Sequence, residues 1–151
     1  MRINLPKNDA KYHWTNHVIG KMIYYGLSAE RVKRVMRSPH RSEKGIAPDT
    51  IAVMCPSKYV SRNLALRNNN EPARGEPKKP LFWKEEIWVM YTVKKISTPS
   101  LETENWKLKI NNFSQPRKVI ITAWRYPGVS KIREAIPIPN DILEELKNIK
   151  Y

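Results

Sequence analysis

The sequence feature that most constrains the fold is the apolar run at residues 119–123, which is almost entirely β-branched and is followed by a Pro-Gly pair. β-Branched side chains favour extended backbone, and Pro-Gly ends such a segment in a turn. The run therefore predicts a strand that is buried on both faces and forms the centre of a sheet. Because side chains alternate along a strand, we expect Arg125 to share a face with Val119, Ile121 and Ala123.

Arg125 stands between Trp124 and Tyr126 at the end of this strand. A cation flanked by two aromatic side chains at the end of a core strand is well placed to present chemistry to solvent. Arg125 is therefore the first candidate site residue. A residue that merely keeps the end of a strand soluble explains the same pattern equally well.

Two amphipathic helices are predicted before residue 40. Thr15 or Asn16 can begin the first helix, and Gly26 ends it at the position expected for a left-handed cap. Ser28 begins the second helix, which ends before Pro39. With so short a connection, the two helices form an αα-hairpin whose apolar side must be covered by another layer.

The remaining periodic segments are mostly extended. Strands are expected at residues 41–46, 50–55, 86–93, 106–110 and 117–126, and Asn140 or Asp141 can cap a last helix. This order predicts an α+β fold, with the N-terminal αα-hairpin packed on one side of a three- to five-stranded antiparallel sheet and a C-terminal helix on that same side.

The length of 151 residues fits a single domain spanning 1–151. Residues 1–13 are polar and irregular, so we expect a loose N-terminal arm. Residues 57–80 are basic and too polar for an ordinary connection, so they are interpreted as a loop insertion, within which 59–66 can form a short helix.

The net charge of +14 and the pI near 10.0 are the strongest compositional signals. Such a charge attracts polyanions, and nucleic acid is the most abundant polyanion of the cytosol. A generally cationic surface, or contact with acidic membranes or partners, is the alternative. No apolar run is long enough for a membrane span and no signal peptide is evident, so a cytoplasmic protein without membrane contact is expected. The single Cys55 fits a reducing compartment and is expected to be a buried, inert thiol.

Several of these segments resemble a known family. The stretch His17-x3-Lys21-Met-x2-Tyr-Gly26-Leu-Ser-x-Glu-Arg-Val-x2-Val35 resembles the opening of BrnT-like domains, and Trp88-Val-Met-Tyr with Val119-Ile-Ile-Thr-Ala-Trp-Arg125 resembles their last two strands. BrnT-like domains belong to the RelE/barnase-like superfamily of small ribonuclease folds. The resemblance covers about residues 13–56 and 86–126, and Trp124 stands where the family pattern has its arginine.

The resemblance implies a metal-independent endoribonuclease of toxin type, with an acidic antitoxin or the ribosome as partner. Cutting RNA without a metal requires a group that moves protons and cations around the transition state. His17 suits the first role, with Lys21 nearby to lower its pKa, while Arg31 and Arg125 suit the second. Each also has a simpler interpretation, because a histidine or arginine on a helix surface is commonly just solvated.

A non-catalytic basic RNA- or ribosome-binding module is the alternative function. A third possibility is an interaction protein whose basic loop at 57–80 docks an acidic partner. No spacing typical of a metal site or of a nucleotide cofactor occurs in the chain, so none is expected. The residues expected to contact nucleic acid are cations and exposed aromatic side chains: Arg34, Arg37, Arg62, Arg67, Lys78, Lys79, Trp83 and Tyr126.

Overall fold

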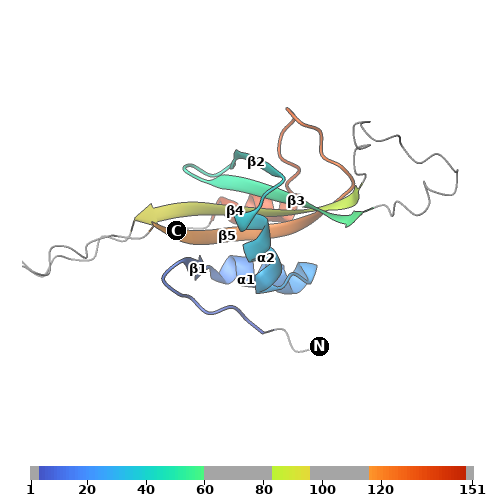
Figure 1. Cartoon of the computed structure of the whole chain (residues 1–151). Coiled ribbons are helices and arrows are strands. Elements are labelled where there is room, and N and C mark those ends of the chain that lie inside the picture. The colour runs from blue at the N-terminus through green and yellow to red at the C-terminus, as the bar shows by residue number, and fades with distance from the viewer. Residues whose placement is uncertain (1–3, 60–82, 96–115, 149–151) are drawn as a thin grey trace, which may run out of the picture.

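The computed structural model describes residues 4–59, 83–95 and 116–148, which form an α+β fold with a five-stranded sheet and three helices (Figure 1). In chain order the elements are β1 (Tyr12–Trp14), α1 (Asn16–Tyr25), α2 (Ala29–Arg37), β2 (Arg41–Lys44), β3 (Ile51–Tyr59), β4 (Trp83–Lys95), β5 (Pro116–Pro127) and α3 (Asn140–Leu146). The predicted strands at 41–46, 50–55, 86–93 and 117–126 and all three predicted helices are thereby confirmed. The predicted strand at 106–110 lies outside the described residues.

The sheet has the strand order β1-β5-β4-β3-β2 and is mixed. β2, β3, β4 and β5 pair antiparallel, whereas β1 pairs parallel to β5, with His13 opposite Val119. The prediction of a purely antiparallel sheet is therefore wrong at this edge. β1 has three residues, too few for alternation to show in a sequence, and its pairing joins segments more than a hundred residues apart.

The N-terminal arm predicted at 1–13 is wrong at its end, because residues 12 and 13 belong to β1. Side chains of the preceding segment hold this strand in place. Asp9 Oδ1 accepts hydrogen bonds from the backbone N–H groups of Lys11 and Tyr12, and Asn8 Oδ1 accepts one from Trp14. These bonds satisfy backbone donors that the short strand would otherwise leave open.

A bulge interrupts β5. Met90 pairs with Thr122 and Tyr91 with Ile120, which leaves Ile121 as the additional residue. The alternation of side chains therefore shifts by one, and Ile120 packs into the same core cluster as Ala123. The prediction that Val119 and Ile121 share the face of Ala123 and Arg125 by strict alternation is wrong for this reason.

Each face of the sheet carries its own core. α1 and α2 cover one face, where Val18, Met22, Val32 and Val35 are buried with residues of β3, β4 and β5 (Figure 1). The other face holds a cluster of fully or almost fully buried side chains: Ala52, Met54, Trp88, Met90, Trp124 and Ile142. Since Ile142 belongs to α3, the prediction that all helices lie on one side of the sheet is wrong.

The two tryptophans at the centre of this second core explain why α3 packs on this face of the sheet. The rings of Trp88 and Trp124 are stacked with centroids 6.0 Å apart and an interplanar angle of 4°. Trp124 also donates a hydrogen bond from Nε1 to the carbonyl of Pro137, in the segment that leads to α3. The aromatic surface needs an apolar cover, and the stripe containing Ile142 and Leu146 supplies it.

The helix ends follow local rules. Thr15 Oγ1 accepts a hydrogen bond from the Val18 backbone and Ser28 Oγ from that of Arg31, while Gly26 ends α1 with φ +64°, as predicted. α3 differs, because Pro139 precedes it and no side chain caps its first turn. The prediction of an Asn140 or Asp141 cap is therefore wrong.

Two further expectations concern β3. Residues 57–59 continue this strand, so the predicted loop at 57–80 and its short helix begin too early at that end; residues 60–80 lie outside the described residues. Cys55 is half-buried rather than buried, and its Sγ donates a hydrogen bond to the carbonyl of Ser38 at 3.1 Å.

Among the described residues, no helix has the length and apolarity needed to span a membrane.

Candidate functional site

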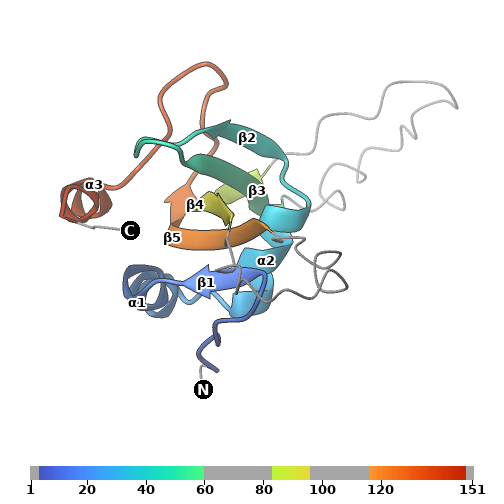
Figure 2. The ribbon, with the colours of Figure 1, turned by 90° about the vertical axis from the view of Figure 1, so that its left-hand side faces the viewer.

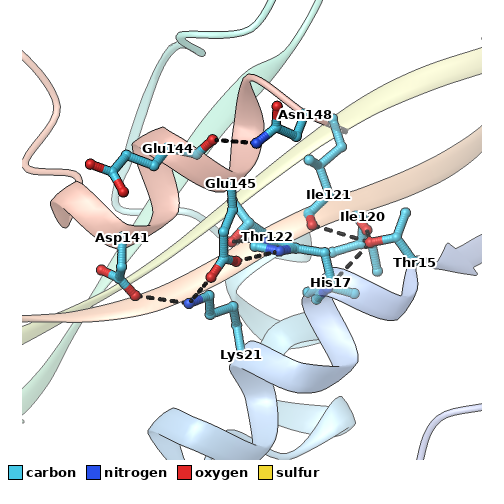
Figure 3. A network of polar contacts seen from close by, with 11 residues as sticks. Thr15, His17, Lys21, Ile120, Ile121, Thr122, Asp141, Glu144, Glu145 and Asn148 are labelled. Atoms are coloured by element: carbon cyan, nitrogen blue, oxygen red, sulfur yellow. Dashed lines mark hydrogen bonds and ion pairs between the residues drawn. The ribbon is translucent and has the colours of Figure 1, made fainter. Parts of the chain in front are cut away.

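His17 and Lys21 lie one turn apart on α1 and face α3 (Figure 3). His17 Nδ1 is 2.8 Å from Glu145 Oε2, and its Nε2 is 3.1 Å from Thr122 Oγ1 on β5. Lys21 Nζ is 2.8 Å from Asp141 Oδ2 and 3.3 Å from Glu145 Oε1. The structure thus brings two of the predicted site residues together, within a network that joins α1, β5 and α3.

The partners of His17 define its protonation state. Burial, helped by the charge of Lys21, lowers the pKa of His17 against the opposing carboxylates of Glu145 and Asp141. The neutral tautomer that satisfies both neighbours carries its proton on Nδ1, donates it to Glu145 and accepts a hydrogen bond from Thr122. His17 is therefore a neutral imidazole at pH 7, which is the form a general base requires.

Lys21 remains charged. Burial opposes its charge, but the hydrogen bonds to Asp141 and Glu145 outweigh burial and raise the pKa of Lys21. The pKa of Asp141 is lowered, mainly by the hydrogen bond that its carboxylate accepts from Lys21. The pair is a charged bridge between α1 and α3 at neutral pH.

The carboxylate of Glu145, the imidazole of His17 and the hydroxyl of Thr122 follow one another in the same order as the catalytic triad of serine hydrolases. Thr122, however, is completely buried, so its hydroxyl cannot reach a substrate. The side chain of His17 is itself 12% exposed, because α3 covers it. With α3 in place, the network orients His17 but keeps it from any large ligand.

Arg125 has a different environment. Its Nε donates to the carbonyl of Tyr25 at 2.7 Å, its Nη2 to that of Gly26 at 3.2 Å, and its Nη1 to Glu85 Oε2 at 2.9 Å. Tyr25 and Gly26 end α1, where carbonyl groups lack helical partners and the helix dipole favours a cation. Arg125 therefore closes the C-terminal end of α1.

The four predicted catalytic residues do not form one site. Arg125 binds the last turn of α1, whereas His17 lies in its first turn, about 12 Å away along the axis at 1.5 Å per residue. Arg31 lies on α2 and forms no ion pair with any described residue. His17 and Lys21 are the pair that the structure assembles.

The exposed cations of α2 continue toward the β1 edge of the sheet. Arg34 and Arg37 are exposed, and the nearest carboxylate oxygen to Arg37 is that of Glu30 at 3.9 Å. Lys33 points toward β1, with its Nζ 5.5 Å from the centre of the Tyr12 ring. Lys33 thus links the basic face of α2 to a second group of cations.

We call this second group the Tyr12 patch: Lys11, Tyr12, Lys33, Arg117 and Lys118. Lys11, Tyr12, Pro116 and Lys118 line a hollow of about 240 Å³. Lys118 Nζ lies 5.3 Å from the centre of the Tyr91 ring. Lysines from the segment before β1, from α2 and from β5 therefore lie against Tyr12 or line the hollow beside it.

Two acids of the described residues accompany these cations: Asp9, and Glu30, whose Oε1 is 3.6 Å from Lys33 Nζ. Hydrogen bonds from the backbone of Tyr12 and Lys11 are the main cause that lowers the pKa of Asp9, and the charges of Lys33 and Arg117 add to it. Both carboxylates keep their charge, so the four cations of the patch and these two acids together carry a net charge of +2. The residues of this patch were not predicted, because the sequence gives no sign that β1 pairs with β5. The basic and aromatic side chains at residues 11–14 are a local signal of this patch, but they do not indicate its pairing with β5.

Trp83 and Tyr126, predicted to contact nucleic acid, are both half-buried and pack against the second core. Trp83 Nε1 donates to Glu86 Oε1 at 3.1 Å, so its polar atom is engaged. The predicted binding residues Arg62, Arg67, Lys78 and Lys79 lie outside the described residues.

Within the described part of the chain, no three His, Cys, Asp or Glu side chains gather so as to hold a metal ion. Comparison of the chain with protein-family models, curated proteins and solved structures finds no match. The BrnT-like resemblance therefore stays a prediction. Any functional conclusion must come from the residues and their geometry.

Proposed function

We propose that this protein binds RNA through the Tyr12 patch and the adjoining basic face of α2. The observation that carries the proposal is the convergence of cations from three segments around Tyr12 and the hollow next to it. Phosphate groups supply most of the affinity of such surfaces, and an aromatic ring among cations suits a base. The charge of +14 acts in the same direction by attracting polyanions over a distance.

The contacts within the patch favour an anion as ligand. Lys33 and Lys118 rest against tyrosine rings, so these long side chains are held with their ammonium groups at the surface. Less side-chain freedom is lost when such a cation binds a phosphate than when a freely moving lysine does. The Tyr12 patch is therefore better prepared for a phosphate backbone than an average basic surface.

The test is fluorescence anisotropy of a labelled single-stranded oligouridine, titrated with protein between 50 and 300 mM salt. The variant is Lys11→Gln with Lys118→Gln. Each phosphate contact to a single strand contributes about 0.7 to the salt slope, or about fivefold in affinity at 0.1 M salt. We expect the double variant to bind about 25-fold more weakly at that salt and with a slope smaller by about 1.4.

The matched control is Lys44→Gln with Lys131→Gln, which removes the same charge from the β2 edge and from the segment after β5. We expect its affinity to stay within about threefold of the original protein. Equal weakening in both double variants would mean that the net charge alone attracts RNA. Absence of binding by the unaltered protein at 50 mM salt would reject the proposal.

A metal-independent endoribonuclease is the second candidate, and the neutral, oriented imidazole of His17 favours it. Incubation of RNA with the protein in EDTA tests it, with His17→Gln as the variant that should abolish cleavage. If the protein binds RNA but does not cleave it, the proposed function is that of a non-catalytic RNA-binding module in the cytoplasm. An acidic antitoxin or the ribosome is the partner class that the BrnT-like resemblance suggests.

A further inference from the structure

α3 places two carboxylates on the imidazole of His17 and the ammonium of Lys21, both on α1, as Figure 3 shows. Carboxylate and phosphate oxygens are alike as partners of an ammonium or an imidazole, because both are anionic acceptors of hydrogen bonds. We propose that His17 and Lys21 form an anion-binding site whose resting occupant is α3, and that RNA phosphates compete with α3 for it. The identity of the competitor rests on the proposed function, whereas the site itself does not.

Several features show that α3 is held lightly. It is seven residues long, and no side chain caps its first turn. Ile142 is its single fully buried side chain, and its backbone makes no extensive close contact with any other element. Asp141 and Glu145 are about half-exposed, at 51% and 48%, so water already reaches the two carboxylates.

The connection to β5 is held at Ser130 and at Pro137, so displacement concerns α3 itself, beyond Pro137. Between the end of β5 and the start of α3, residues 128–139 contain neither helix nor strand. In Figure 2 α3 stands to one side of the sheet with α1 below it, so it can move outward without disturbing the strands. Because Ile142 would lose its apolar cover, α3 remains docked until an anion replaces its carboxylates.

The experiment compares two double variants with the same charge change. Asp141→Asn with Glu145→Gln removes the carboxylates from His17 and Lys21. Glu134→Gln with Glu144→Gln removes two carboxylates that contact neither residue. Binding of the labelled oligouridine and of inorganic tripolyphosphate is measured for both. We expect the first variant to bind each probe at least fivefold more tightly than the second, and a further Lys21→Gln change to remove the gain.

A second measurement follows the His17 imidazole by NMR during a pH titration. Release of α3 removes the burial of His17, so its pKa should rise toward the ordinary value in the first variant. If α3 stayed docked without the Glu145 charge, the pKa would fall instead. That fall, or equal affinity of both double variants for both probes, overturns the proposal.

The two proposals can fail separately. Tighter binding of tripolyphosphate with no binding of RNA would support the anion site and reject RNA as its ligand. Binding of RNA with equal affinity by both double variants would leave the proposed function intact and reject the competition by α3.

Discussion

Arg125 offers the sharpest distinction between a structural and a ligand-binding role. Arg125→Met keeps most of the apolar stem and removes every donor. Two hydrogen bonds from a charged donor to carbonyls are lost, each of about 1.5–3 kcal/mol, and so is the bond to Glu85. Arg125 is 28% exposed, so water can replace part of this, and Glu85 keeps Lys58 at 3.2 Å. We therefore expect a loss of about 2–4 kcal/mol in the free energy of unfolding.

Arg125→Lys should lose about 1–2 kcal/mol, because one ammonium cannot reach both carbonyls and Glu85 in the fork geometry. Both free energies are measured by urea unfolding followed by tryptophan fluorescence. RNA affinity, measured on folded protein, should stay within about threefold. Arg34→Met is the matched comparison, since Arg34 is an exposed arginine on α2, and we expect it to weaken RNA binding while stability changes by less than about 0.5 kcal/mol.

The reasoning is refuted if Arg125→Met unfolds within about 0.5 kcal/mol of the original protein while RNA binding or cleavage is lost. That result would mean that the guanidinium is available to a ligand and that the last turn of α1 does not depend on it.

Two other predictions follow from the polar networks. Glu86 is completely buried and accepts hydrogen bonds from Trp83 Nε1, Trp88 Nε1 and both the N–H and hydroxyl of Ser130. Glu86→Gln replaces one of the two acceptor oxygens by an amide group that donates, so a donor faces donors, and it should cost about 2–4 kcal/mol in urea unfolding. A cost below about 1 kcal/mol would contradict this account of the network. The lowered pKa of His17 means that the unfolded chain takes up a proton first, so the stability contributed by neutral His17 is present above pH 6.5 and is lost as the pH falls below it. The free energy of unfolding should therefore rise between pH 5 and 7, less steeply in His17→Gln than in the original protein; an equal slope in both would show that His17 titrates normally.

Local rules allowed much of the fold to be predicted. Thr15, Gly26 and Ser28 act on backbone groups within a few residues of themselves, so the bounds of α1 and α2 can be read from sequence. The apolar runs of β3, β4 and β5 are long enough for their composition to indicate strands. The pairing of His17 and Lys21 on one helix face likewise follows from their spacing.

The partners of these residues depend on tertiary packing. Arg125 was recognised as a notable cation, but its acceptor is a carbonyl 100 residues earlier in the chain, and the bulge at Ile121 changes which neighbours share its face. The Tyr12 patch requires the parallel pairing of β1 with β5, which a three-residue strand does not reveal.

The sequence by itself determined the helices, the central strands and the strongly basic character of this protein, because these depend on neighbouring residues and on composition. The tertiary structure alone decided that Arg125 closes a helix, that α3 covers His17 and Lys21, and that cations gather around Tyr12. Each of these contacts joins segments far apart in the chain, and its energy depends on strand register and on which face of the sheet is covered. No local pattern of side chains records that information.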